Sequence, residues 1–305
     1  MQRVRKQIGL KEDRILRDGT GVVIAVLDTG VGGHPDLDGK VLDFQDFVHH
    51  RAVSYDDSGH GTHVCGILCG SGRLSGGRYR GMAPGAKLVV GKVLDARGDG
   101  ETENMIAGLD WVLAQRGRYG IRILNISVGI GALDDRQKET ALTRKLEQLW
   151  DEGILVVCAA GNKGPRNNSI TSIGGNGRVV TVGCHDGAYF RDYPGRCETY
   201  SGRGDPNGRM RKPDLVAPGT EIVSCDVRCR ETRNGYRNAY LAKSGTSMAT
   251  PVVSGAAALL MQGNPEMTNE QCRDRLLFTC TDLGLPWNRQ GFGMVNLDWL
   301  QGQGR

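Results

Sequence analysis

The chain has 305 residues, of which 39% are hydrophobic and 24% are charged, values typical of a folded protein and not of a disordered one. Lysine and arginine outnumber aspartate and glutamate by 39 to 34, a formal net charge of +5, and form no dense basic block. The composition therefore argues against a nucleic-acid partner and favours an ordinary solvated surface.

The N-terminal residues contain no apolar run of signal-peptide length, and no later stretch is long and apolar enough to cross a membrane. We therefore expect no membrane partner. No linker or internal repeat divides the rest of the chain. The sequence predicts a short extension over residues 1–20 and a single domain over residues 21–305.

Apolar runs alternate with amphipathic stretches through the first two thirds of the chain, a pattern typical of parallel strands joined by helices. Strands are predicted at Val22–Leu27, Lys87–Leu94, Ile121–Val128, Ile154–Ala159 and Val179–Cys184. Helices are predicted at Glu101–Arg116, Asp135–Glu152 and Thr268–Thr279, and His185–Arg211 is predicted as loop. The predicted fold class is α/β, with a mainly parallel central sheet flanked by helices.

Three residues stand at special points of this pattern. In IAVLDTG, Asp28 ends an apolar strand and is followed by a glycine turn. The end of a strand is where open α/β sheets place catalytic groups. His63 follows a glycine-flanked turn in HGTHVCG, and Ser247, in SGTSMATP, opens a helix that is apolar on every side. Pro251 is expected within the first four positions of that helix, where its missing N–H removes no bond. Each residue alone has an ordinary explanation: a turn aspartate, a buried histidine and a helix-capping serine.

Together these residues predict nucleophilic catalysis. A serine hydroxyl attacks a carbonyl when a histidine takes its proton and a carboxylate orients the histidine. The chain order Asp28, His63, Ser247 is that of the subtilisins, and DTG, HGTH and GTSMATP resemble the motifs of the subtilisin-like serine peptidases. The resemblance runs from about Gly21 to about Leu300. It implies a three-layer subtilisin-like fold and a serine endopeptidase of broad specificity that acts on polypeptides, similar in character to intracellular members.

The resemblance also implies the rest of the site. Asn162, in VVCAAGN, matches the family's oxyanion-hole asparagine. A substrate strand would pair with Gly98-Asp99-Gly100 and with Ser127-Val128-Gly129. The primary pocket would be formed by Ser127–Gly129, by Ala159, Ala160 and Gly161, and by Thr171 at its base, with Lys163 at the rim. Thr102 and Met105 match the pocket for the fourth residue before the scissile bond.

No cofactor is expected for the chemistry. Calcium is common in the family, but the loop Gly72–Gly81 contains no carboxylate or asparagine, so the usual high-affinity site is not expected. Asp214 is a candidate for a weaker site with carbonyls around Gly174–Val179, although we favour a structural role for it. The spacing of Cys225 and Cys229, without a second ligand cluster, does not indicate zinc and leaves a disulfide or two free thiols open.

Nine scattered cysteines, an odd number, favour free thiols in a reducing compartment and hence a cytoplasmic location. Cys65, Cys158 and Cys184 are interpreted as small buried apolar residues. Two alternatives to the peptidase remain open: a catalytically silent binding protein that kept the fold, and an esterase that uses the same three residues.

Overall fold

Seven strands form the central sheet of the computed structural model, which describes residues 1–10, 17–128, 136–190, 195–208 and 210–302. Every pairing in this sheet is parallel. In spatial order the strands are β2 (Val41–Asp46), β3 (Lys87–Lys92), β1 (Val23–Asp28), β4 (Ile121–Ile126), β5 (Leu155–Ala159), β6 (Val180–Cys184) and β7 (Leu215–Ala217). The strand order reverses around β1, and the carboxyl ends of strands at such a reversal border a crevice.

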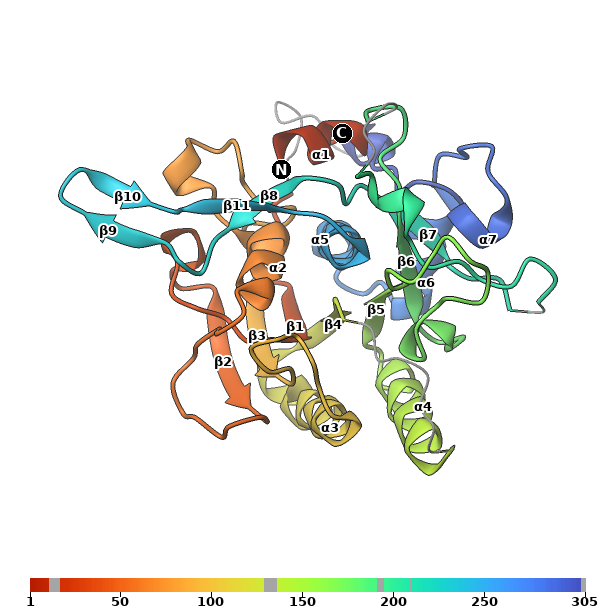
Figure 1. Cartoon of the computed structure of the whole chain (residues 1–305), viewed down its shortest axis with the longest axis horizontal. Coiled ribbons are helices and arrows are strands. Elements are labelled where there is room, and N and C mark those ends of the chain that lie inside the picture. The colour runs from red at the N-terminus through yellow and green to blue at the C-terminus, as the bar shows by residue number, and fades with distance from the viewer. Residues whose placement is uncertain (11–16, 129–135, 191–194, 209, 303–305) are drawn as a thin grey trace.

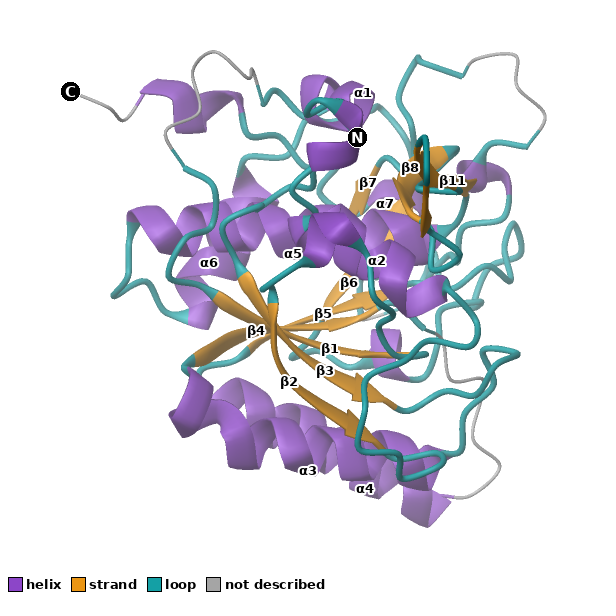
Figure 2. Ribbon diagram, turned by 90° about the vertical axis from the view of Figure 1, so that its left-hand side faces the viewer, coloured by secondary structure: helices purple, strands orange, loops and turns teal. Residues whose placement is uncertain are grey.

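Helices cover both faces of the sheet, which gives three layers (Figure 2). The helices on one face are α2 (His60–Cys69), α5 (Thr246–Gly263) and α6 (Asn269–Phe278), and those on the other are α3 (Thr102–Tyr119) and α4 (Arg136–Asp151). In β1 the side chains of Ile24 and Val26 pack in the core beneath α2 and α5, whereas Ala25 and Leu27 pack beneath α3. Because both faces are covered, the strand is apolar at every position and not at alternate ones.

The five predicted strands and the predicted helices agree with the structure to within three residues at each end. Strands β2 and β7 were missed, because β2 is half-exposed and mixed in polarity and β7 is only three residues long. Two antiparallel pairs were also missed. They join β8 (Ile222–Cys225) to β11 (Tyr240–Lys243), and β9 (Arg230–Thr232) to β10 (Gly235–Arg237). A 3-10 helix, Cys197–Thr199, interrupts the predicted loop. A short helix, α7 (Trp287–Gln290), lies near the C-terminus.

The first residues fold against the domain as helix α1, Gln2–Gln7 (Figure 1). Val4 is buried in the core that contains α2 and α5. Arg5 is also buried, and its guanidinium donates a hydrogen bond to the carbonyl of Gly81. Arg3 pairs with Asp186 at 3.1 Å. The N-terminal segment is thus held by apolar packing and by charged contacts.

The expectation of free thiols is wrong for one pair of cysteines. Cys184, at the end of β6, forms a disulfide with Cys197, with their Cα atoms 5.7 Å apart. The sequence could not indicate this pairing, since connectivity depends on how the loop between the two residues returns to the sheet. Cys65, Cys69, Cys158, Cys225, Cys229, Cys272 and Cys280 are free. No helix in the described part of the chain is long and apolar enough to cross a membrane.

Candidate active site

Asp28 is the fully buried last residue of β1, the strand that has β3 on one side and β4 on the other. Its Oδ1 accepts a hydrogen bond from the backbone N–H of Thr29 at 2.7 Å. The same oxygen lies 2.7 Å from Nδ1 of His60. A central strand therefore fixes the carboxylate, and the carboxylate fixes the imidazole.

The histidine paired with Asp28 is His60, and the prediction that it would be His63 is wrong. His60 is the first residue of α2, after Gly59, whose φ of 78° lies in the left-handed region that glycine tolerates. His63 lies one turn later. Since a helix rises about 1.5 Å per residue, this moves His63 about 4.5 Å along the axis, away from Asp28. Its Nε2 instead lies 3.0 Å from the carbonyl oxygens of both Ile222 and Leu241.

The environments of the two histidines shift their pKa values in opposite directions. Burial disfavours the charged form of His60, but the charge of Asp28 and the hydrogen bond to it outweigh burial and raise the pKa above 6.5. Burial, together with the positive charge of Lys243, lowers the pKa of His63 to about 3. His60 can therefore exchange a proton near neutral pH, whereas His63 remains neutral there.

Ser247 is the half-exposed second residue of α5. The helix begins at Thr246, so Pro251 is its sixth residue and not one of the first four. The expectation that Pro251 removes no helical bond is therefore wrong, because its missing N–H leaves the Ser247 carbonyl without its usual partner four residues on. The position of Ser247 nevertheless places it among the free N–H groups at a helix start.

Asn162 is held beside Ser247 by the start of α5. Its Oδ1 accepts hydrogen bonds from both the backbone N–H and the hydroxyl of Thr246, each at 3.1 Å. This leaves the amide Nδ2 as the group available to donate. A Cβ on Gly245 would lie 3.3 Å from that Nδ2, so glycine at this position allows the amide its close approach.

The predicted substrate strands lie in loops at the carboxyl edge of the sheet. Gly98-Asp99-Gly100 is exposed, between β3 and α3. After β4, Ser127 is fully buried and Val128 is half-buried, whereas Gly129 lies outside the described residues.

The predicted pocket residues occupy the neighbouring loops. Ala159 and Ala160 are buried at the end of β5, and Gly161 follows them. Thr171 lies next to this segment, with its hydroxyl donating to the Ala159 carbonyl at 3.1 Å. Lys163 is exposed.

The two residues predicted for the more distant pocket are largely buried. Met105 is 1% exposed, within the core beneath α3, and Thr102 is 8% exposed. In this structure Met105 is therefore a core residue, and substrate could reach it only after a rearrangement.

The residues around Asp214 do not fit a calcium ion. The carboxylate accepts hydrogen bonds from Thr181 N–H at 2.7 Å and from the ammonium of Lys212 at 2.6 Å. Lys212 also donates to the carbonyl of Val179 at 2.6 Å. A lysine ammonium thus takes the acceptors that a cation would need.

A buried group of possible metal ligands, His34, Asp36 and Cys225, is likewise in use. Nδ1 of His34 accepts from Asp36 N–H at 3.0 Å, and its Nε2 lies 2.7 Å from the Ala239 carbonyl. Neither ring nitrogen is left open for a metal ion.

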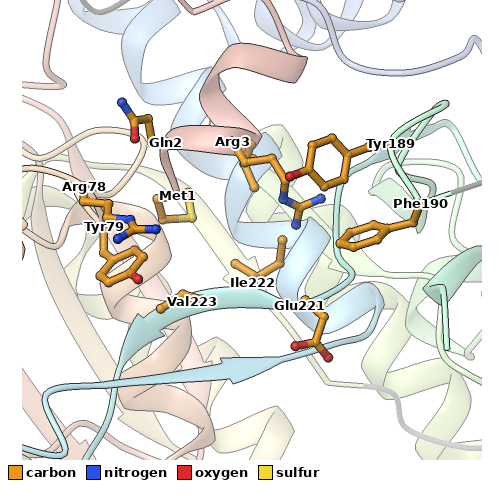
Figure 3. Close-up of a pocket in the computed structure, with 11 residues that line it drawn as sticks. Met1, Gln2, Arg3, Arg78, Tyr79, Tyr189, Phe190, Glu221, Ile222 and Val223 are labelled. Atoms are coloured by element: carbon orange, nitrogen blue, oxygen red, sulfur yellow. The ribbon is translucent and has the colours of Figure 1, made fainter. Parts of the chain in front are cut away.

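A cavity of about 320 Å³ lies beneath α1, away from this site. Figure 3 shows Arg3 extending from α1 toward the rings of Tyr189 and Phe190, with Glu221 on the side of the cavity away from α1. Asp28, His60 and Ser247 are not among its lining residues. The cavity therefore belongs to the packing of the N-terminal helix.

Comparison with known proteins identifies the family. A sequence profile of the subtilase family, peptidase family S8, matches residues 19–295. Serine protease AprX of Bacillus subtilis is 38% identical over 297 residues, which cover 92% of this chain and 66% of AprX. The chain thus spans just under two thirds of that relative's own length. Subtilisin Savinase of Lederbergia lenta is 34% identical over 280 residues, covering 92% of this chain and 90% of Savinase.

Solved structures agree with these sequence matches. Sphericase superposes with a TM-score of 0.80 at 28% identity and covers 97% of this chain and 99% of its own. A cold-adapted subtilisin-like serine proteinase superposes with a TM-score of 0.69 at 30% identity, over 92% of this chain and 89% of its own. The chain therefore belongs to the subtilase family.

Proposed function

We propose that this chain hydrolyses peptide bonds with Ser247 as the nucleophile, His60 as the general base and Asp28 as the residue that orients His60. The observation that carries this assignment is the 2.7 Å contact between Asp28 Oδ1 and His60 Nδ1. Donation from Nδ1 to the carboxylate leaves the lone pair of the neutral imidazole on Nε2, free to accept the Ser247 proton.

The reaction then follows in two halves. Ser247 Oγ attacks the substrate carbonyl while its proton passes to His60 Nε2, and the His60 imidazolium then protonates the departing amine. Nδ2 of Asn162 and the free N–H groups at the start of α5 stabilise the oxyanion of the tetrahedral intermediate. Water, deprotonated by His60, releases the acyl group by the same route.

The proposed substrate is an extended polypeptide. Its main chain would pair with Gly98–Gly100 on one side and with Ser127–Gly129 on the other. Recognition through backbone groups supports broad specificity. The exposed ammonium of Lys163 at the pocket rim would disfavour lysine or arginine before the scissile bond and tolerate acidic residues there. A peptide library that showed a clear preference for lysine or arginine at that position would contradict this part of the proposal.

The assignment is tested by labelling with a fluorophosphonate probe, followed by peptide mapping. We expect the label on Ser247, none in Ser247→Ala, and almost none in His60→Ala. His63→Ala is the matched control, because it removes the other histidine of the same motif. Normal labelling in folded His60→Ala, together with loss of labelling in folded His63→Ala, would contradict the assignment of His60. Absence of labelling in the folded wild type at neutral to alkaline pH would contradict the proposed activity.

The catalytic steps above use only groups of this chain and water, and we propose that the chemistry needs no cofactor. Unchanged hydrolysis of a peptide after exhaustive dialysis against EDTA, in protein whose fold is verified by circular dichroism, is the expected result. Loss of activity without unfolding, restored by a metal ion, would contradict it.

The cytoplasmic location also remains a proposal. It rests on the seven free cysteines, whereas the Cys184–Cys197 disulfide argues for an oxidising compartment. Alkylation of the protein in freshly lysed source cells, followed by mass spectrometry, distinguishes the cytoplasm from an oxidising compartment. A fully alkylated Cys184 supports the cytoplasm, and an intact disulfide contradicts it.

A further inference from the structure

A hairpin rich in arginine projects from the body of the molecule. It consists of β9 and β10, joined by the Arg233–Asn234 turn and carried by the β8–β11 pair. Figure 1 shows it extending beyond the edge of the domain, on the other side of α2 from the connection between β3 and α3. From residue 226 to residue 243 the chain has five basic residues and two acidic ones.

The arginines of the hairpin are arranged so that they repel one another. Arg230 and Arg237 are direct partners across β9 and β10, so their side chains leave the same face, and both are exposed. Arg233, at the turn, is exposed as well. In the described part of the chain, no carboxylate lies within ion-pair distance of these three residues, whereas Arg228 at the hairpin base is paired with Asp226. Like charges directly opposite in a ladder cost stability, and a bound anion would offset that cost.

The base of this hairpin lies against the catalytic histidine's helix. Val227 packs on Gly59, the residue before His60: a Cβ at Gly59 would lie 2.8 Å from the Val227 side chain. Val227 and Arg228 lie in a turn closed by a hydrogen bond from the Cys229 N–H to the Asp226 carbonyl at 3.0 Å, and β9 begins three residues after Val227 at Arg230. Three residues span at most about 10 Å. The arginines are thus within a few residues' reach of the scissile bond.

Lys243 continues the positive charge from the hairpin to the site. It ends β11, three residues before α5 begins, and is half-buried. Burial has the largest influence on the pKa of His60 and the Asp28 charge the next, but the Lys243 ammonium also contributes by lowering it. The ammonium is therefore close enough to act electrostatically on the catalytic pair.

These positions determine which half of a substrate would meet the hairpin. We assign the two loops that pair with the substrate in the proposed function, after β3 and β4, to the half before the scissile bond, because the pocket for the residue before that bond borders the same loops. We therefore place the half that follows the scissile bond on the other side of α2, the helix that begins at His60, where Figure 1 shows β8, β11 and the hairpin. At about 3.3 Å per residue, the third to sixth residues of that half would extend about 10 to 20 Å past the site and meet Arg230 and Arg237.

We propose that the β9–β10 hairpin and Lys243 form a binding surface for an acidic segment of the polypeptide substrate, located about three to six residues after the scissile bond. The proposal rests on the proposed endopeptidase function. Its physical basis is attraction between exposed, unpaired arginines and carboxylates, which accelerates association and is screened by salt.

Two internally quenched peptides test the proposal. They are identical through the second residue after the scissile bond and then continue with four glutamates or with four glutamines. At low ionic strength we expect kcat/KM for the glutamate peptide to exceed that for the glutamine peptide by about 5- to 10-fold, and the ratio to fall toward one at about 0.5 M salt. In Arg230→Glu/Arg237→Glu the ratio should drop to one or below, with the glutamine peptide still cleaved.

A matched variant controls for net charge. Arg118→Glu/Arg144→Glu makes the same change in charge on exposed residues of α3 and α4, on the opposite face of the sheet. We expect it to keep the wild-type ratio. Equal cleavage of the two peptides by the wild type, or a preference that survives in Arg230→Glu/Arg237→Glu, would overturn the binding surface and leave the endopeptidase intact. Failure of the wild type to cleave even the glutamine peptide would overturn the proposed function itself.

Discussion

His60 and His63 lie on one helix, three residues apart, yet only His60 has a carboxylate partner, at 2.7 Å from Asp28. A general base must be neutral to accept the serine proton. Because the charge of Asp28 and the hydrogen bond to it raise the pKa of His60 above its ordinary value of 6.5 despite burial, kcat/KM should fall tenfold per pH unit below an apparent pKa that is raised in the same direction. A pH–rate profile measured at low substrate concentration checks this expectation. A profile that is flat from pH 5 to 9 would contradict a histidine base.

Asn162 offers a second measurement at the scale of one residue. With its Oδ1 occupied by Thr246, its Nδ2 can donate to an oxyanion. Asn162→Ala should lower kcat by about 10²- to 10³-fold and change KM little, because the donor acts mainly in the transition state. Steady-state kinetics on a peptide amide decides the matter, with Asn176→Ala as the control for an asparagine on a neighbouring loop. A rise in KM with an unchanged kcat would show a ground-state binding role instead.

The residues of the site illustrate how far sequence reasoning reaches. Apolar runs predict the strand ends beside Asp28 and Asn162, and another apolar run predicts the helix that Ser247 opens. The motif HGTH contains two histidines, and choosing between them requires knowing that α2 begins at His60 and not at Thr62. Gly59 was the available signal, since glycine is among the residues favoured directly before the first residue of a helix.

Among the elements, α1 is the one whose role the sequence least suggested. Its buried Arg5 donates to the Gly81 carbonyl, and Val4 packs in the core. Arg5→Ala should therefore destabilise the fold by about 1 to 3 kcal/mol, through a buried carbonyl left without its donor and through lost packing of the side-chain stem. Urea denaturation measures the change, and Lys6→Ala, on the exposed face of the same helix, should leave the midpoint nearly unchanged. Equal midpoints for the two variants would show that α1 contributes little.

Elements with long apolar runs were predicted, and those whose formation depends on distant partners were not. Val180–Cys184 is buried throughout and was found from its pattern. The three residues of β7, Leu215–Ala217, form a strand because β6 is available to pair with them. The β9–β10 hairpin is exposed and polar, so no apolar alternation marked it.

For the whole molecule, the two histidines of α2 make opposite contributions to stability as pH changes. His63 has a folded pKa of about 3 and an unfolded pKa near 6.5, so the unfolded chain binds the proton more readily between these values. Its contribution is complete above pH 6.5 and is lost as pH falls toward 3, by at most about 1.4 kcal/mol per pH unit. His60 has a raised folded pKa, so its contribution is present below the unfolded pKa and is lost as pH rises through the folded one.

These opposite contributions predict opposite changes in the pH dependence of the free energy of unfolding for two matched variants. His63→Gln keeps an N–H donor for the carbonyls of Ile222 and Leu241, and its free energy of unfolding should fall less steeply than that of the wild type between pH 6.5 and 5. His60→Gln removes the opposing contribution, and its free energy of unfolding should fall more steeply over the same interval. Urea titrations at pH 7, 6 and 5 measure all three slopes. Parallel slopes for wild type and His63→Gln would mean that His63 takes up its proton in the folded state, against its burial beneath β8 and β11.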